Sequence, residues 1–281
     1  MAVTNFIPQI WEARLLEHLD KALVYGGLVN RDYEGDITQQ GDTVKINQIG
    51  DITVKDYDKS TGIMVEDLDS TQTTLTIDQR KYFAFTVDDL DAVQANIQLV
   101  DSAMQRASYG LRDAVDQYIA GLYAGAGTTA DLGTDETPLA ITSATKAYES
   151  LVDIKTALDG ANVPSDNRFV VVPPAFYGYL LKDSRFVSAG TQKTDQVLQT
   201  GYIGDAAGFH IYQSNNVPNT EGAKYKVLAG TRAAITFAQQ LLRTEAMRSE
   251  AKFADVVRGE LVFGAKVVQP KALACMTANF K

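Results

Sequence analysis

Hydrophobic and polar side chains alternate along residues 41–62, in the sequence GDTVKINQIGDITVKDYDKSTG. Alternation with a period of two is typical of β-strands, and the pair Gly50 and Asp51 predicts a turn between two of them. We therefore expect a long β-ribbon in this region. Many side chains on both of its faces are polar, which indicates a ribbon that lies outside the core of its own chain.

A second alternating stretch covers residues 73–87 and differs from the first because one of its faces is apolar. Phe83, Phe85 and Val87 are expected on one side of this strand, since successive side chains point to opposite faces. Tyr82 is expected on the other side. The phenylalanine side is therefore predicted to pack on the hydrophobic core.

From Asp88 onward the apolar residues are separated by steps of three and four, which is the period of an α-helix. They are Leu90, Val93, Ile97, Val100, Met104, Ala107, Leu111, Val115, Tyr118 and Leu122. A helix of about 35 residues at ~1.5 Å each would be roughly 50 Å long and would span the molecule as a spine.

Charged residues of the same stretch fall mostly off the apolar stripe. They are Asp91, Asp101, Arg106, Arg112 and Asp116. We expect them to form a solvated face, and their presence argues against a helix that spans a membrane.

Further elements lie on both sides of this helix. An amphipathic helix is predicted over residues 10–23. A second unit, later in the chain, combines a helix that ends at Gly160, the apolar strand RFVVV, a helix through Leu181 and a strand over 209–213. Strand-like stretches follow from Ile235 to the carboxy terminus. This order predicts an α+β fold in which the chain leaves its first domain and later returns to it.

The composition narrows the possible partners. The chain has 281 residues, 45% of them hydrophobic, and a formal net charge of −9. A negative charge opposes the phosphate neutralisation on which tight nucleic-acid binding depends, so we do not expect tight DNA or RNA binding. The single cysteine, Cys275, lies in an apolar run and is expected to be a buried, inert thiol. No basic leader or membrane-spanning stretch is evident, and we expect synthesis in a cytoplasm.

Motifs for catalysis or metal binding are absent from the sequence. His18 has no second ligand one helical turn away, so it does not form a zinc motif of the HExxH kind. His210 lies in a predicted strand, where a packed or edge histidine is the simpler interpretation. Asp88, Asp89 and Asp91 are expected to cap a helix rather than to hold a cation.

Two loop segments complete the list of chemical candidates. The sequence GAGTTA, residues 125–130, matches a dinucleotide-binding turn, but it follows a predicted helix instead of a strand. Asp131, Asp135 and Glu136 lack the ligand spacing of a calcium loop. We therefore expect no catalytic residue, no cofactor and no metal ligand.

The order of the predicted parts resembles the Hong Kong 97-type major capsid proteins of tailed bacteriophages. The resemblance rests on the stretches FIPQIWEARLLEHLDKALVYGGLVNRDYEG, GDTVKINQIG, TIDQRKYFAFTVDDLD, VVVPPAFYGYLL, GFHIYQSNNVP and GAKVVQPKALA. It implies an amino-terminal arm over 1–35 and an extended β-ribbon loop over 36–86. It also implies a spine-helix peripheral domain over 87–139 and 229–281, and an α/β axial domain over 140–228.

The same resemblance implies a function and a set of partners. The chain would assemble with copies of itself, as pentamers and hexamers, into the icosahedral head shell that encloses a double-stranded DNA genome. A separate scaffolding protein and a portal protein would be its partners, and the virion its location after assembly in the bacterial cytoplasm. An encapsulin-like nanocompartment shell is an alternative. A nucleotide-dependent enzyme built around Gly125 and Gly127 is a second alternative.

The reach of the predicted ribbon indicates where it makes contacts. A ribbon arm of about 15 residues at ~3.3 Å each extends roughly 50 Å, which is comparable with the width of a globule of this length. Its tip is therefore expected to lie on a neighbouring subunit. The candidate contact residues are Val44, Ile46, Ile52, Val54, Lys55 and Lys59.

Overall fold

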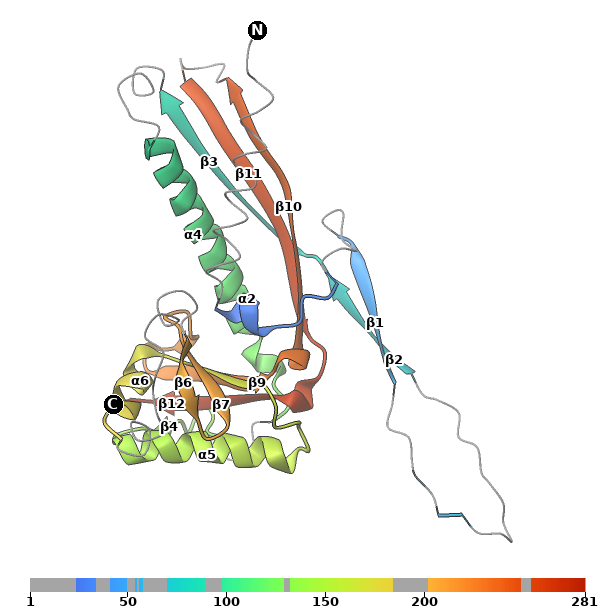
Figure 1. Cartoon of the computed structure of the whole chain (residues 1–281), viewed down its shortest axis with the longest axis vertical. Coiled ribbons are helices and arrows are strands. Elements are labelled where there is room, and N and C mark those ends of the chain that lie inside the picture. Colours follow the sequence, from blue (N-terminus) through green and yellow to red (C-terminus); the bar gives the residue numbers. More distant parts are fainter. Residues whose placement is uncertain are drawn as a thin grey trace.

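The computed structural model describes residues 24–33, 41–49, 54, 56–57, 70–88, 98–128, 132–183, 202–248 and 254–280. The amino-terminal helix predicted over residues 10–23 lies outside these ranges. The described parts form an α/β unit, an elongated unit of helix and sheet, and a projecting two-stranded ribbon (Figure 1).

A seven-stranded sheet forms the centre of the α/β unit, with strand order β4-β12-β9-β5-β7-β6 and β8 paired to β9. The strands are β4 (Leu139–Ala140), β5 (Arg168–Val172), β6 (Tyr202–Ala206), β7 (Phe209–Gln213), β8 (Asn219–Thr220), β9 (Lys224–Thr231) and β12 (Leu273–Asn279). Every residue of β5 is buried. A continuous apolar run such as FVVV is typical of a strand that is covered on both faces.

Two helices accompany this sheet, α5 (Ala144–Gly160) and α6 (Pro174–Leu180), and they pack against each other. The Ser143 side chain accepts a hydrogen bond from the Lys146 N–H and so caps the start of α5. Beyond the end of α5, the buried Arg168 donates to Asp159 Oδ1 at 2.7 Å and to the carbonyl of Pro164 at 2.8 Å. These bonds fix the loop that leads from α5 into β5.

The position of β12 corrects the domain boundary expected from the sequence. Residues 229–281 were expected to lie with the spine helix, but β12 pairs with β9 and β4 in the seven-stranded sheet. A 3-10 turn, Pro270–Ala272, separates β12 from β11. The first six residues of β12 are all buried, because the strand lies inside the α/β sheet between β4 and β9.

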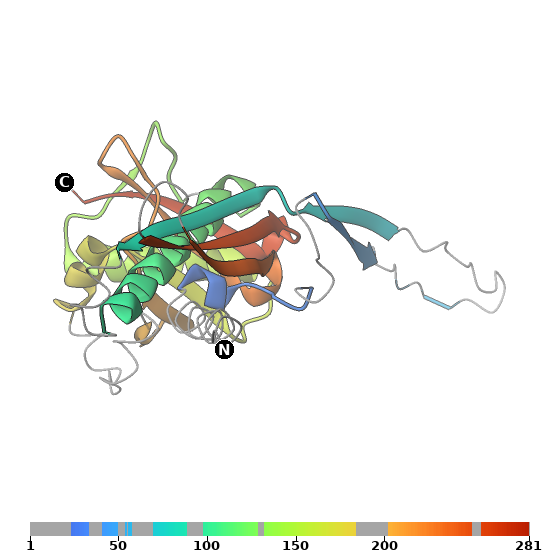
Figure 2. The same cartoon turned by 90° about the horizontal axis from the view of Figure 1, so that it is seen from above.

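The elongated unit consists of a three-stranded sheet and one long helix. Its strands are β3 (Gln79–Asp88), β10 (Ile235–Arg248) and β11 (Ala254–Val267), in the order β10-β11-β3, and its helix is α4 (Gln98–Ala120). Helix α4 packs against β3 and β11 and lies along the sheet in both views (Figures 1 and 2). The Tyr118 and Phe263 rings meet edge to face between the helix and the sheet.

The long helix confirms most of the predicted spine and corrects where it begins. Met104, Leu111 and Val115 are buried, as the spacing predicts, and so is Ile119. Asp88 does not belong to the helix but is the last residue of β3, where it pairs with Ala254. The helix-cap interpretation of Asp88 is therefore wrong. Asp89 and Asp91 lie outside the described residues.

The phenylalanine face of β3 also agrees with the sequence. Phe83 and Phe85 are partly buried against the main core, whereas Tyr82 on the other face is exposed. Among the described residues, no helix is both long enough and apolar enough to cross a membrane.

Helix α4 provides a test of this arrangement. We expect Met104→Asp to lower the free energy of unfolding by several kcal/mol, because the new carboxylate would be buried without a partner. Gln105→Asp places the same side chain on the exposed face one residue away and should change stability by no more than about 0.5 kcal/mol. Urea unfolding of the two variants measures the difference, and equal losses would contradict the orientation of α4.

Candidate intersubunit surface

The ribbon consists of β1 (Thr43–Ile49) and β2 (Ser70–Thr76), paired antiparallel from Thr43 with Thr76 to Ile49 with Ser70. It projects away from the other elements in both views (Figures 1 and 2). The turn predicted at Gly50 and Asp51 would have paired β1 with the residues that follow directly. The structure instead pairs it with a strand that begins at Ser70.

The root of the ribbon has a small hydrophobic core of its own. Val44 and Ile46 are only 9% and 6% exposed, and Leu75 and Ile77 of the same ribbon are fully buried. They contact three residues of the long strands and their surroundings, namely Ala238, Val262 and Val268. We call these seven residues the root cluster.

The root cluster corrects the interpretation of the two apolar residues on the first strand. Val44 and Ile46 were expected to face a neighbouring subunit, but they are buried within their own. The physical reason is that Leu75 and Ile77 give them apolar partners, whereas an exposed stripe would leave this surface in water. These two residues are therefore structural, and their burial leaves them unavailable as contacts with a neighbouring subunit.

Hydrogen bonds and close packing fix the direction in which the ribbon projects. The Gly41 N–H donates to the Ile77 carbonyl at 2.9 Å, and the Ile77 N–H donates to the Asp42 carbonyl at 3.1 Å. The Lys266 ammonium donates to the Thr74 carbonyl. Gly264 lies so close to the Thr76 carbonyl that any Cβ at this position would overlap it. The ribbon is thus held against β11 at its root.

The far part of the ribbon is different. Val54 is 95% exposed, and Asp56 and Tyr57 are exposed as well. None of these three residues belongs to a strand or helix. The other predicted contact residues, Ile52, Lys55 and Lys59, lie outside the described residues. Val54 therefore keeps the role of a candidate contact, since no part of its own subunit covers it.

The long sheet has a second exposed surface, which contains a hollow of about 670 Å³. Tyr82 is 80% exposed there, and Met247 is also exposed. Two charged pairs surround them: Arg80 with Glu260, and Arg258 with Glu245. Each pair joins one positive and one negative side chain, so the charges around Tyr82 and Met247 balance. This surface therefore offers apolar contact area between balanced charges.

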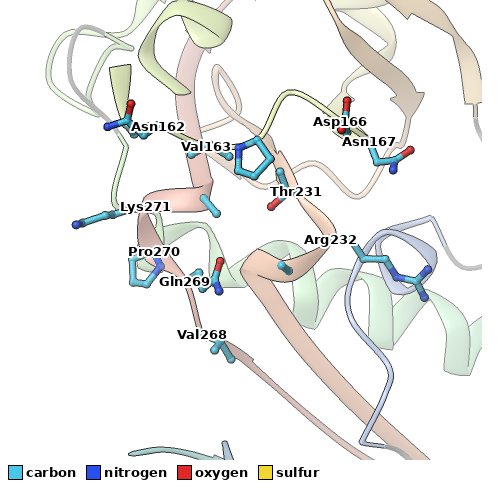
Figure 3. Close-up of a pocket in the computed structure, with 14 residues that line it drawn as sticks. Asn162, Val163, Asp166, Asn167, Thr231, Arg232, Val268, Gln269, Pro270 and Lys271 are labelled. Atoms are coloured by element: carbon cyan, nitrogen blue, oxygen red, sulfur yellow. The ribbon is translucent and has the colours of Figure 1, made fainter. Parts of the chain in front are cut away.

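A larger hollow, of about 910 Å³, lies between the α/β unit and the start of the long sheet (Figure 3). Its walls are the loop that follows α5, the turn before β10 and the turn before β12. Asn162 and Asn167 in the first wall have left-handed backbone conformations, with φ of 56° and 53°. The Arg232 side chain points away from the hollow towards the amino-terminal segment, where its Nε donates to the Val29 carbonyl.

A buried carboxylate joins the amino-terminal segment to α4. Asp116 is 3% exposed and accepts hydrogen bonds from the N–H groups of Val24, at 3.0 Å, and Gly26, at 3.4 Å. The two donors belong to the short helix α2 (Tyr25–Leu28) and the residue before it. The prediction that Asp116 lies on a solvated face is therefore wrong, because α2 covers this side of the long helix.

The burial of Asp116 changes its protonation. Removal from water raises its pKa to about 6, an effect that the N–H groups of Val24 and Gly26 and the nearby Arg112 guanidinium oppose but do not cancel. Tyr25, whose ring is also buried, has a raised pKa for the same reason, first from burial and then from the Asp116 charge.

The segment that matches a dinucleotide-binding turn packs against residues near the end of β11 and the turn before β12. Gly125 ends a 3-10 turn that follows α4, so no strand leads into it. The Gly127 N–H donates to the Pro270 carbonyl at 2.8 Å, and a Cβ at Gly127 would overlap the backbone of Pro270. Gly127 thus allows close approach to the turn before β12, and a Cβ at Gly125 would overlap the Val267 side chain, so both glycines pack against their own chain instead of forming a phosphate cradle.

The other residues considered for chemistry are paired or buried within the fold. His210 lies in β7, as predicted, and its Nδ1 is 2.5 Å from Asp205 Oδ1 on the neighbouring strand. Asp135 pairs with the buried Lys226. Cys275 is buried, and this burial raises its pKa to about 11, so that it is protonated at neutral pH. Among the described residues, no three histidine, cysteine, aspartate or glutamate side chains are grouped to hold a metal.

The fold and the projecting ribbon define a class of protein, the Hong Kong 97-type capsid subunits. A solved structure from Mycobacterium phage Che8 is 30% identical, with a TM-score of 0.69 and coverage of 90% of each chain. The capsid of cyanophage P-SCSP1u is 17% identical, with a TM-score of 0.70 and coverage of 93% of this chain and 89% of that chain.

A virus-like particle from Pyrococcus furiosus shares the fold at 11% identity, with a TM-score of 0.56 and coverage of 97% of this chain and 100% of that chain. No curated protein matches the sequence. The profile of the phage capsid protein family matches residues 71–276. This chain belongs to the phage capsid protein family.

The root cluster leads to a prediction about stability. Leu75→Ala should lower the free energy of unfolding by about 2–5 kcal/mol, because it leaves a cavity in a closed cluster. Val54→Ala, at an exposed site of the same ribbon, should change it by no more than about 0.5 kcal/mol. Chemical unfolding of unassembled subunits measures the free energy of unfolding of each variant and of the parent. A silent Leu75→Ala would show that the root does not contribute to the fold.

Asp116 leads to a prediction about pH. Its pKa is raised in the folded state, so the native chain binds a proton more tightly than the unfolded chain does. Protonation of Asp116 therefore stabilises the fold below about pH 4, and this contribution is lost as the pH rises through about 6. The effect is limited to about 1.4 kcal/mol per pKa unit.

The neutral variant Asp116→Asn should remove this dependence. Unfolding by urea at pH 4.5 and at pH 7 is expected to show that the parent loses stability relative to Asp116→Asn as the pH rises. Asp153→Asn, at an exposed position of α5, is the control and should follow the parent at both pH values. A constant difference between parent and Asp116→Asn would contradict the raised pKa.

Proposed function

We propose that this chain is the major capsid protein of a tailed bacteriophage, which self-assembles into the icosahedral head shell around the double-stranded DNA genome. The observation that carries this proposal is the ribbon, which is fixed at its root and whose far residues are exposed where the structure describes them, at Val54, Asp56 and Tyr57. A projection with an uncovered apolar side chain such as Val54 is stabilised when another subunit covers it.

The parts of the subunit would have separate roles in the shell. Residues 1–35 would form the arm and 36–86 the extended loop that reaches over an adjacent subunit. The spine helix with β3, β10 and β11 would form the peripheral domain. The α/β unit of residues 140–228, joined by β12, would form the axial domain that meets its copies in pentamers and hexamers.

The chemistry of the described residues supports a structural role without catalysis. The candidate nucleotide turn packs against Pro270, and Cys275 is buried and protonated. The net charge of −9 disfavours tight binding of the enclosed DNA. A scaffolding protein and a portal would assist assembly in the host cytoplasm, and the mature location would be the virion.

A second candidate is the shell of an encapsulin-like compartment, since the Pyrococcus furiosus virus-like particle has the same fold. The two functions differ in their contents. Particles recovered from infected cells should contain double-stranded DNA if the chain is a phage capsid protein, and a cargo enzyme if it is a compartment shell.

Assembly itself can be tested with the expressed protein. Sedimentation velocity and negative-stain microscopy should show closed or partial shells, in the presence of the phage's scaffolding protein where it is required. A compact monomer under all of these conditions would contradict the proposed function.

Removal of the far part of the ribbon tests its role as a clasp between subunits. We expect that replacing residues 50–69 with a short Gly-Ser turn leaves the root cluster intact and keeps the melting temperature of the unassembled subunit within a few degrees. Particle yield should fall by at least tenfold, because the intersubunit contact is lost.

The boundaries of this deletion matter, because a cut that includes Val44 and Ile46 would also remove buried residues and unfold the root. Replacement of residues 50–69 by a Gly-Ser segment of equal length is the matched control for chain entropy. Shells of normal yield and stability from the shortened variant would show that the ribbon does not clasp a neighbour.

A further inference from the structure

The chain passes from the ribbon into the long sheet through a junction of two residues. Strand β2 ends at Thr76 and β3 begins at Gln79, so Ile77 and Asp78 form this junction (Figure 1). Strand β2 pairs with β1, whereas β3 pairs with β11. The angle between the ribbon and the long sheet is therefore set at the junction.

The junction crosses β11 at a residue without a side chain. A Cβ at Gly264 would overlap the Thr76 carbonyl oxygen and would lie 3.0 Å from Ile77 Cα. Backbone therefore lies directly against backbone at the crossing. Contacts on either side of this point have to restrain the rotation of the ribbon about it.

The root cluster provides such contacts on one face of the long sheet. Ile77 and Val262 both belong to it. Val262, Gly264 and Lys266 share this face, because alternate residues of a strand point to the same side. The Lys266 ammonium donates to the Thr74 carbonyl at 2.9 Å, which adds a second contact on the same side.

A separate contact holds the junction from the opposite face. Phe263 points to that face, where its ring lies 5.4 Å from the Tyr118 ring of α4, measured between centroids. The Tyr118 hydroxyl donates to Asp78 Oδ1 at 3.1 Å. Hydrogen bonds to a carboxylate are stronger than those between neutral groups. The junction is thus attached to the body of the subunit on both faces of the sheet.

Tyr118 is suited to act as a constant hydrogen-bond donor. Its pKa is raised to about 12, first by burial and then by the charge of Asp78, while the backbone N–H of Ala265 opposes the increase. The hydroxyl group therefore keeps its proton at neutral pH and can donate to Asp78.

We propose that the hydrogen bond between Tyr118 and Asp78 is a brace that holds the ribbon at the angle needed for assembly. This inference rests on the proposed shell function and assigns a positioning pair to it. With the root cluster on one face and the brace on the other, the ribbon cannot swing about Gly264 without breaking one of these contacts. An element that is already held at its binding angle loses less conformational entropy on association.

Electron paramagnetic resonance of unassembled subunits tests the brace directly. Spin labels at Gln72→Cys on β2 and Gln105→Cys on α4, both exposed positions, report the distance between ribbon and helix. Cys275 is buried and should remain unlabelled. We expect a narrow distance distribution, and one roughly twice as broad after Tyr118→Phe, which removes the hydroxyl group but keeps the ring on Phe263.

Tyr109→Phe is the matched control, because it removes a hydroxyl group from an exposed tyrosine of the same helix. It should leave the distribution as narrow as in the labelled protein without further change. An unchanged width in Tyr118→Phe would overturn the inference.

Particle yield tests whether assembly depends on the brace. Tyr118→Phe should give at least about fivefold fewer particles than Tyr109→Phe at a similar urea midpoint of unfolding. Asp78→Ala, which removes the acceptor, should lose as much, whereas Asp78→Asn keeps an acceptor oxygen and should assemble like the parent. The double variant of Tyr118→Phe and Asp78→Ala should be no worse than either single variant, since both act through one bond.

Each other outcome decides between this inference and the proposed function. Losses that multiply in the double variant, or a broad distribution with normal particle yield, would overturn the inference and leave the shell function intact. If Tyr118→Phe does not fold, the exposed position Asp78 carries the same tests through its alanine and asparagine variants. Failure of the parent to form particles would contradict the proposed function, while spectroscopy of the unassembled subunit would still show whether the brace exists.

Discussion

The architecture of this subunit depends on the attachment of the ribbon root to the long sheet. Val44 and Ile46 pack against Leu75 and Ile77 of the ribbon and against Val262 of β11, and this burial attaches the two-stranded ribbon to the long sheet. An isolated hairpin is only marginally stable in water. Contact with a third strand supplies the apolar surface that the hairpin lacks, and it fixes the direction in which β1 and β2 project.

A capsid subunit has to combine a stable body with surfaces that remain incomplete until assembly. In this chain the body is closed by the buried faces of α4, β5 and β12, all of which belong to the main hydrophobic core. An incomplete surface is present on the far part of the ribbon, where Val54 is 95% exposed. The separation has a physical advantage, because changes at the contacts between subunits need not disturb the core.

Asp116 shows how a polar group can be part of such a body. Its carboxylate accepts hydrogen bonds from N–H groups at the start of α2 in place of hydrogen bonds from water. These bonds connect the amino-terminal segment to the long helix. Two backbone donors satisfy the charge in part, but burial still favours the protonated form and raises the pKa to about 6. The connection is therefore sensitive to pH in the mildly acidic range.

The sequence by itself determined the periodic elements and the class of protein. The spacing of Met104, Leu111 and Val115 predicted the buried face of α4, the run RFVVV predicted an apolar strand, and the order of the parts led to the capsid family. These features are local, since a helix or strand repeats its buried face every few residues. Only the tertiary structure decided that Val44 pairs across to Leu75, that Asp116 is covered by α2 and that β12 joins the α/β sheet. Each of these depends on contacts between residues far apart in the chain and on the exclusion of water by those contacts. Local periodicity does not predict such contacts.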